Sequence, residues 1–284
     1  MNTNTANIPE GYAIPKNVVL NTDNEVVEVL DSIAIYEHIC EKDGRKRVLT
    51  LNLVGTTPAH LKGWELVQKR ELMTVGISIG NGYFNKERME IILTGMANYF
   101  SEVVAIVPDV PAVYTYQALG YDKHHAERRV KEHRNKIVNC CESIINESQK
   151  SDGCNIKLQL MTWHDDFPQQ EYYQQAYKRA VEIYHFSSKF RESIQRNTKH
   201  YILARLKDQD IQQLGGVDHV VEKAVHYLIE EMALHDVFEV VLGNEPIASY
   251  YKELELIPNY ANGKYDNTPN KHVGWVVYNI VDSE

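Results

Sequence analysis

The chain has 284 residues and a formal net charge of -9 at pH 7, with 43% hydrophobic and 24% charged residues. This composition is typical of a soluble globular protein with a substantial core, and no run of about 18 apolar residues is present that could span a bilayer. The acidic balance argues against general affinity for nucleic acid, so any RNA contact must be a local basic patch.

The polar N-terminus, Met1 to Pro15, has neither the basic start nor the apolar run of a secretory signal, so we expect a cytoplasmic protein. The cysteines lack the paired spacing of zinc or redox motifs, and they are interpreted as reduced structural thiols. We therefore expect no metal. We also expect no cofactor and a monomer.

The first seventy residues are predicted to form an N-terminal extension. Within residues 1–70, the first twenty suggest a loosely docked arm because Pro, Asn and Thr dominate them. Alternating and β-branched residues then predict strands at Val26–Tyr36 and Arg47–Val54, and Thr56–Gly63 is expected to be a loop.

A βαβ unit is predicted at the start of the second region, residues 71–284. An apolar strand at Leu72–Ile79 is followed by helical apolar spacing at Asn85–Phe100 and by a second strand at Val103–Val107. Apolar strands joined by a helix favour a parallel sheet that is covered on both faces. The fold class is therefore α/β, with a Rossmann-like parallel sheet flanked by helices.

The later elements are predicted from the same patterns, and Asp122 can cap the N-terminus of a long helix among them. They are a short helix at Ala112–Gly120, a helix from Asp122 to about Gln149, a strand at Ile156–Met161, helices at Gln170–Lys207 and Val217–Leu234, and strands at Val237–Leu242 and Val273–Ile280 with a helix between them.

A serine lies between glycines where the first strand of the βαβ unit ends, in the sequence Gly76-Ile77-Ser78-Ile79-Gly80. Glycines permit a tight turn there, and ligands of open α/β sheets bind at the carboxyl ends of the strands. The following helix offers free N–H groups for a developing oxyanion. The same five residues also fit the nucleophile elbow of α/β-hydrolases or a purely structural turn.

The longer segment from Gly76 to Phe84 resembles the G-x-S-x-x-N-x-Y-F segment of the cyclodipeptide synthases. Further stretches similar to that family are Ala118–Tyr121, Ala126–Lys131 and Tyr227–Glu231. The resemblance implies a fold similar to the catalytic domain of class I tyrosyl- and tryptophanyl-tRNA synthetases. It also implies that the protein takes aminoacyl groups from charged tRNAs and needs no ATP.

The resemblance implies roles for three catalytic residues. Ser78 would accept an aminoacyl group, and reaction with a second aminoacyl-tRNA would give a dipeptidyl-enzyme that cyclises to a diketopiperazine. Glu231 would hold the substrate ammonium and accept a proton, while Tyr227 would orient the reacting groups. Their spacing of four puts both on one helix face. Glu230 is the competing carboxylate.

Further substrate-binding residues are expected around this centre. Gly76 and Asn81 belong to the serine turn, and the resemblance implies that Tyr173, or its neighbour Tyr172, helps to hold the substrate amine. Thr74 and His235 could line the first side-chain pocket, which hints at a polar amino acid. The chain departs from the family in one respect, because no tyrosine ends the predicted Val237–Leu242 strand; Tyr250 or Tyr251 could replace it.

The helix that begins at Asp122 carries more basic than acidic residues in an otherwise acidic chain. A solvated face is the ordinary interpretation of such a helix, but the family has an equivalent basic helix, so we expect it to contact the acceptor arm of the aminoacyl-tRNA. The candidate RNA-binding residues are Lys123, Arg128, Arg129, Lys131, Arg134 and Lys136.

A second basic set on the next long helix is a weaker candidate for RNA contact. It consists of Lys189, Arg191, Arg196, Lys199 and Arg205. Besides the hydrolase, a third hypothesis is a tRNA-binding module without catalytic activity, which would bind charged tRNA without forming an aminoacyl-enzyme.

Overall fold

The computed structural model describes residues 32–42, 45–54, 67–150, 157–242, 246–252, 255–261, 263–265, 268 and 274–283. The predicted N-terminal arm, the predicted loop at Thr56–Gly63 and the part of the first predicted strand before Ser32 lie outside these residues.

The helices and strands within the described residues alternate through most of the chain. In chain order they are β1 (Ser32–Lys42), β2 (Arg45–Val54), β3 (Leu72–Gly76), α2 (Lys86–Tyr99), β4 (Glu102–Val107), α3 (Asp109–Ala118), α4 (Lys123–Lys150), β5 (Lys157–Thr162), α5 (Trp163–Asp166), α6 (Glu171–Phe186), α7 (Ser188–Leu203), α8 (Asp208–Gln213), α9 (Val217–Leu242), β6 (Ile247–Tyr250), α10 (Leu256–Ala261) and β7 (Gly274–Ser283).

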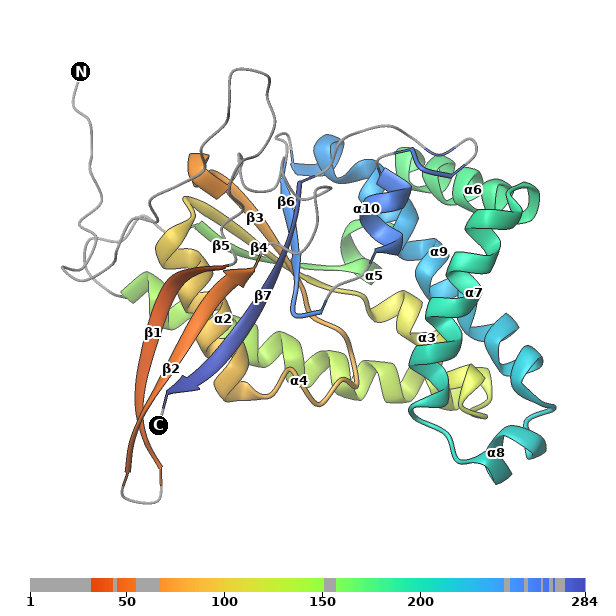
Figure 1. Ribbon diagram of the computed structural model, residues 1–284, viewed down its shortest axis with the longest axis horizontal. Coiled ribbons are helices and arrows are strands. Elements are labelled where there is room, and N and C mark those ends of the chain that lie inside the picture. Colours follow the sequence, from red (N-terminus) through yellow and green to blue (C-terminus); the bar gives the residue numbers. More distant parts are fainter. Residues whose placement is uncertain are drawn as a thin grey trace.

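The described strands form one seven-stranded sheet in the order β1-β2-β7-β6-β3-β4-β5 (Figure 1). Strands β7, β6, β3, β4 and β5 are mutually parallel, as the βαβ pattern predicts. The sheet as a whole is mixed, because the hairpin β1–β2 pairs antiparallel with β7. The described part of the first seventy residues therefore extends the same sheet as the α/β core.

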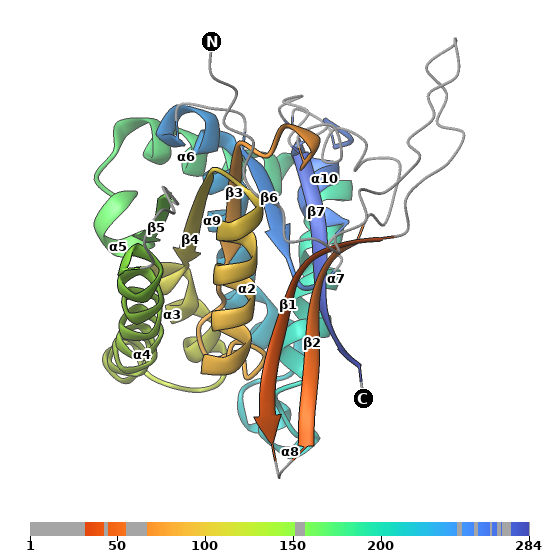
Figure 2. The same cartoon turned by 90° about the vertical axis from the view of Figure 1, so that its left-hand side faces the viewer.

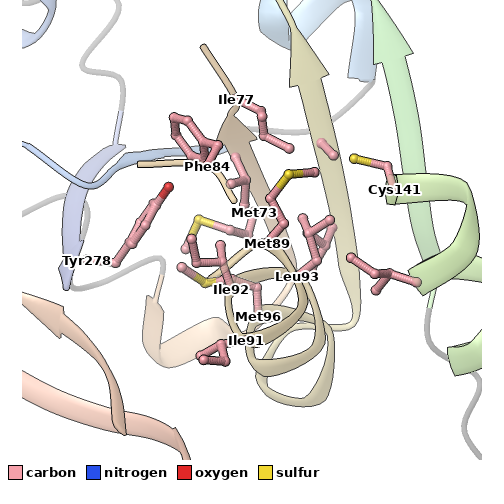
Figure 3. Close-up of a cluster of buried hydrophobic side chains, with 14 of the residues drawn as sticks. Met73, Ile77, Phe84, Met89, Ile91, Ile92, Leu93, Met96, Cys141 and Tyr278 are labelled. Atoms are coloured by element: carbon pink, nitrogen blue, oxygen red, sulfur yellow. The ribbon is translucent and has the colours of Figure 1, made fainter. Parts of the chain in front are cut away.

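One face of the sheet packs against α2 and α4 (Figures 2 and 3). Met73 and Val75 of β3 point to this face and join the α2 residues Met89, Ile92 and Met96 in one buried cluster. Leu72 points the other way and belongs to the cluster on the opposite face. This alternation follows from the two-residue period of a strand, and it gives both faces of β3 apolar partners.

The opposite face is covered by α3 and by the C-terminal helices. Helix α9 makes extensive contacts with α3, α6 and α7 and carries the longest stretch of buried apolar residues in this layer. In Figure 2, α2 crosses in front of the sheet and α9 lies behind it. By the alternation of β3, Thr74 and Gly76 face the α9 side.

The predicted βαβ unit is confirmed, with small changes at its boundaries. Helix α2 begins where Asn85 accepts a hydrogen bond from the backbone N–H of Arg88 at 2.9 Å, which satisfies one of the free donors of the first turn. Asp122 caps α4 in the same way, through a 2.9 Å bond from the backbone N–H of His125. The long helix predicted from Asp122 is therefore also confirmed.

Two predictions for the C-terminal half are wrong. The helix predicted at Gln170–Lys207 is broken at Ser187, which ends α6 and caps α7 by accepting a bond from the backbone N–H of Phe190. The strand predicted at Val237–Leu242 is the last part of α9, in which Val237 and Phe238 are buried while Val240 is 63% exposed. The next strand in the sheet is β6, at Ile247–Tyr250.

Candidate active site

Ser78 lies in a loop that leaves the carboxyl end of β3. The backbone N–H of Ile77 still bonds to the carbonyl of Ile106 in β4 at 2.9 Å, so the chain turns away directly before the serine. Gly80 has a positive φ of 70°, a conformation that glycine adopts without strain. Because α2 begins only at Lys86, a loop of several residues separates the serine from the helix. This differs from the sharp strand-to-helix elbow of the hydrolases.

The hydroxyl of Ser78 lies 2.6 Å from the hydroxyl of Tyr250. Tyr250 is the last residue of β6, and β6 runs parallel to β3 as its direct neighbour. The carboxyl ends of the two strands therefore meet at one edge of the sheet, which is where the serine turn was expected to lie. Ser78 itself is 7% exposed.

Helix α9 brings Tyr227 and Glu231 to the same place. Ser78 lies close enough to Tyr227 for its hydroxyl to lower the pKa of the tyrosine, and Glu231 interacts electrostatically with both Tyr227 and Tyr250. Tyr227 and Glu231 are each partly exposed. The structure thus brings together the three residues expected to be catalytic, and it adds Tyr250 to them.

Burial dominates the titration of this cluster. It raises the pKa of Glu231 to about 8, and it raises the pKa values of Tyr227 and Tyr250 well above 10, where the nearby Glu231 carboxylate adds to the effect. Both tyrosines therefore remain protonated at neutral pH and can donate and relay protons. Glu231 is the group that can change its charge near neutral pH.

Asn81 fastens the serine loop to the end of β6. Its side-chain amide donates to the hydroxyl of Tyr251 at 2.8 Å, and its side-chain oxygen accepts from the backbone N–H of Tyr83 at 3.0 Å. The rings of Tyr83 and Tyr251 also stack, with centroids 3.9 Å apart. Asn81 thus holds the loop that carries Ser78. The ring of Tyr250 packs closely on the start of this loop, since it lies 3.5 Å from where a Cβ on Gly76 would be.

The apparent lack of a tyrosine after the α9 segment has a simple explanation in the structure. The strand that follows α9 is β6, which ends at Tyr250, whereas the predicted strand at Val237–Leu242 is helical. The tyrosine is present at the end of the strand, as the resemblance implies. The sequence pattern did not reveal this tyrosine as the strand's last residue, because it predicted the strand at Val237–Leu242 instead of Ile247–Tyr250.

Tyr173 lies in a separate buried network. Its hydroxyl accepts a 2.8 Å bond from the indole N–H of Trp163 and donates to the carboxylate of Glu230. Glu230 and Glu231 therefore point to different surroundings, and only Glu231 faces the serine. Tyr172 is partly buried against the same apolar layer.

Thr74 and His235 are both buried on the α9 side of the sheet. Thr74 donates its hydroxyl proton to the backbone carbonyl of Ile247 at 3.2 Å, whereas Nδ1 of His235 has no hydrogen-bond partner among the described residues. Burial lowers the pKa of His235 to about 3, so the ring is neutral. It packs edge-on against Phe238 and Trp275.

The basic residues of α4 divide into two groups. Arg134 forms an ion pair with the buried carboxylate of Asp109 at 2.8 Å and contacts Asp165, so its charge is already balanced. The others are exposed, and Lys123 and Arg129 form loose surface pairs with Glu127 and Glu132. Arg128, Lys131 and Lys136 have no ion pair within the described part of the chain.

Comparisons with known proteins place the chain in a family. The family model for cyclodipeptide synthases matches residues 56–278. The chain belongs to the cyclodipeptide synthase family. It is therefore an enzyme. None of the curated protein sequences compared with the chain matches it.

Solved structures of cyclodipeptide synthases share its fold at low sequence identity. The synthase from Staphylococcus haemolyticus matches 81% of this chain and 98% of its own, with 17% identity and a TM-score of 0.65. The synthase from Bacillus thermoamylovorans matches 79% and 95%, with 18% identity and a TM-score of 0.65. A Mycobacterium tuberculosis synthase described as related to type I tRNA synthetases matches 81% and 92%, with 16% identity and a TM-score of 0.61.

The described residues also bear on metals, membranes and disulfides. No group of three or more His, Cys, Asp or Glu side chains in this part of the chain could hold a metal ion. Within the same residues, none of the helices combines the length and apolarity needed to cross a membrane. The described cysteines, Cys40, Cys140 and Cys141, are free.

Proposed function

We propose that this cyclodipeptide synthase joins two aminoacyl groups from charged tRNAs into a diketopiperazine, by ping-pong transfer through an ester on Ser78. The observation that carries the proposal is the convergence of Tyr250, Tyr227 and Glu231 on Ser78 from two separate elements. An aminoacyl-tRNA ester is already activated, so a nucleophile, a proton path and a partner for the ammonium are sufficient for transfer.

In the first half-reaction, Oγ of Ser78 attacks the carbonyl carbon of the aminoacyl ester. A bond forms between Oγ and the carbonyl carbon, and the bond between that carbon and the ribose oxygen breaks. The serine proton ends on the ribose oxygen. Tyr250 and Tyr227 support the transfer, since a protonated hydroxyl can donate one hydrogen bond and accept another along such a relay.

In the second half-reaction, the amine of the serine-bound aminoacyl group attacks the ester carbon of a second aminoacyl-tRNA. A C–N bond forms, the bond between the ester carbon and the second ribose oxygen breaks, and the amine proton ends on that oxygen by way of Glu231, so that a dipeptidyl ester remains on Ser78. Glu231 holds the amine before the attack and accepts its proton, which suits a carboxyl whose pKa is about 8. The new terminal amine then attacks the Ser78 ester, and the cyclic product and the free hydroxyl are released.

The α9 side of the sheet offers polar groups to the first aminoacyl side chain. The unpartnered Nδ1 of the neutral His235 lies one helical turn beyond Glu231, and a buried polar atom without a partner favours a ligand that can hydrogen-bond to it. Together with Thr74 it supports a polar amino acid as the first substrate. Tyr173, buried with its hydroxyl bound to Trp163 and Glu230, would support α9 from that network rather than hold the substrate amine as the resemblance implies.

The exposed cations of α4 would contact the acceptor arm, and Arg134 would support that surface by its pairing with Asp109. Contact of this kind depends on charge and shape rather than on base sequence. Because charged tRNA is consumed, the enzyme would work in the cytoplasm beside translation, and we propose that it does so as a monomer without a metal or other cofactor.

Mass spectrometry of medium from cells that express the protein tests the proposal. A cyclic dipeptide is expected with the wild type and is expected to be absent with Ser78→Ala. In vitro, product formation should stop when ribonuclease is added, and intact-protein mass spectrometry should find an aminoacyl adduct on the wild type alone. Product that forms equally with Ser78→Ala would refute the serine intermediate, and activity on simple esters that survives ribonuclease would favour a hydrolase.

A further inference from the structure

Tyr201 and Arg205 form a cation–π pair at the C-terminal end of α7. The guanidinium carbon of Arg205 lies 4.1 Å from the centre of the Tyr201 ring. Both side chains are partly exposed, and Arg205 has no ion pair within the described residues. A partly exposed guanidinium stacked on tyrosine, with no carboxylate to balance its charge, presents both a flat surface and a positive charge.

This pair lies beside the reaction centre. Tyr201 interacts electrostatically with Glu231 and with Tyr251, both of which belong to the surroundings of Ser78. Burial and these neighbours raise the pKa of Tyr201 to about 12, while Arg205 opposes the rise, so its hydroxyl remains protonated at neutral pH. Of the five basic residues in the second basic set, Arg205 is the one with these connections to the active site.

Tyr116 connects the pair to the serine loop and to α4. Its hydroxyl lies 2.7 Å from where a Cβ on Gly80 would be, and it hydrogen-bonds to Nδ1 of His133 in α4 at 2.5 Å. Arg205 and Arg129 both lower the pKa of Tyr116 against the effect of burial, so positive charge approaches it from the segment after α7 and from α4. Tyr121, which is 39% exposed, packs edge-on against Tyr116, and the centres of the two rings are 5.8 Å apart.

Three tyrosines and Arg205 thus lie in the region where the serine loop, the end of α7 and the start of α4 approach one another. Unpaired bases stack on aromatic and guanidinium planes whatever their sequence, while arginine also attracts the phosphates between them. A double-stranded stem would not expose its bases to such a surface. The part of a charged tRNA that is unpaired and carries the ester is its 3′ end.

We propose that Tyr201 and Arg205, together with Tyr116 and Tyr121, form the subsite that receives the unpaired 3′-terminal nucleotides of the aminoacyl-tRNA and directs its ester to Ser78. The proposal rests on the proposed function, which supplies the charged tRNA. Recognition at this subsite is by stacking and phosphate contact, so it serves tRNAs that carry different amino acids. The α4 cations then hold the double-stranded stem.

The test compares the binding of two uncharged RNAs, so that no amino acid has to be known. Intact bulk tRNA and the same tRNA with its unpaired 3′ nucleotides removed are titrated with the full-length protein by fluorescence anisotropy. Wild type is expected to bind intact tRNA about tenfold more tightly, since stacking of one base contributes on the order of 1–3 kcal/mol. Tyr201→Ala and Arg205→Ala should bind both RNAs with the affinity that wild type has for the trimmed one.

Matched variants separate stacking from charge and from misfolding. Lys178→Ala removes the same charge from an exposed position of α6 and should keep the full difference between the two RNAs. Arg205→Lys keeps the charge but loses the plane, so it should lose most of the difference. Tyr201→Phe keeps the ring and should keep the difference. Unchanged affinity for the trimmed RNA shows that a variant is folded.

The possible outcomes distinguish this proposal from the proposed function. If wild type binds both RNAs equally, or if Arg205→Ala keeps the difference, the 3′-end subsite is refuted even though a cyclic dipeptide is formed. If the difference is found and depends on Tyr201 and Arg205 but no serine-dependent cyclic dipeptide appears, the subsite is supported and the proposed reaction is not.

Discussion

The hydroxyl of Ser78 and the hydroxyl of Tyr250 lie 2.6 Å apart at the carboxyl edge of two adjacent parallel strands. Neither strand alone specifies the contact, since β3 ends before the serine and β6 contributes only its last residue. Because burial raises the pKa of Tyr250 well above 10, its hydroxyl stays protonated through the neutral range. A hydroxyl that stays protonated can donate a hydrogen bond to the serine or pass on a proton, but it cannot serve as a base, and this is the role that we propose for Tyr250.

Tyr250→Phe is expected to lower the rate of cyclic dipeptide formation by about a hundredfold, the lower end of the range for a positioned proton-transfer group. The ring that packs beside Gly76 and Phe84 is retained, so the loss comes from the hydroxyl alone. The rate is measured with purified protein and charged tRNA. Tyr184→Phe, which removes a hydroxyl from α6 that binds only Gln195 in the described structure, is the control. A Tyr250→Phe rate equal to that of this control would contradict the role.

Much of the site could be predicted because its residues lie in local patterns. The loop after β3 is marked by glycines, and Tyr227 and Glu231 share a helix face through their spacing alone. Long elements with regular apolar spacing, such as α2 and α4, were predicted with boundaries close to those observed. These features depend on neighbours in sequence, which a single chain makes visible.

The remaining parts depend on contacts between distant segments. The β-branched residues of 237–242 suggested a strand, but buried Ala233, Leu234, Val237 and Phe238 follow helical spacing and continue α9 into its layer. Strand β6 was missed because it is four residues long and includes Ala248 and Ser249, which have little strand preference. Its sheet partners on both sides, β3 and β7, determine it instead.

Asn81→Ala is expected to loosen the serine loop, because it removes both the bond to Tyr251 and the bond from the backbone N–H of Tyr83. A double-mutant cycle with Tyr251→Phe isolates the first of these bonds. Urea denaturation should give a coupling energy of about 1 kcal/mol between the two side chains, the usual net contribution of such a hydrogen bond. Additive losses would show that the bond does not hold the loop to β6.

Arg134→Ala is expected to destabilise the fold more than it weakens RNA binding. The variant leaves the carboxylate of Asp109, which is 3% exposed, without its cation, and removal of one member of a buried pair costs roughly 3–5 kcal/mol. Arg128→Ala, at an exposed position of the same helix, should leave the free energy of unfolding almost unchanged. Urea denaturation of both variants provides the measurement.

For RNA binding the order of the two residues should be reversed: Arg128 should contribute to tRNA affinity, and Arg134 should contribute little. Arg128→Ala is expected to reduce by about one the slope of the logarithm of tRNA affinity against the logarithm of salt concentration. Arg134→Ala should leave this slope unchanged under conditions in which it is folded, since its charge already faces Asp109 and Asp165. A reduced slope for Arg134→Ala alone would reverse the assignment of these two residues.

Glu231 should make the stability of the free protein depend on pH. Burial raises the pKa of this carboxyl from its ordinary value of 4.5 to about 8, so folding favours the protonated form. A group with a raised pKa in the folded state contributes stability that is fully present below pH 4.5 and is lost as the pH rises toward 8. The loss amounts to at most roughly 1.4 kcal/mol for each pH unit in this interval.

Glu231→Gln removes the titration while keeping a side chain of similar shape. The free energy of unfolding of wild type, measured by urea denaturation, should therefore fall relative to that of Glu231→Gln between pH 5 and pH 8. Other ionisable groups are common to both proteins and cancel in this difference. A constant difference across the interval would mean that Glu231 is ionised in the folded protein throughout, and that it does not take up the amine proton by virtue of a raised pKa.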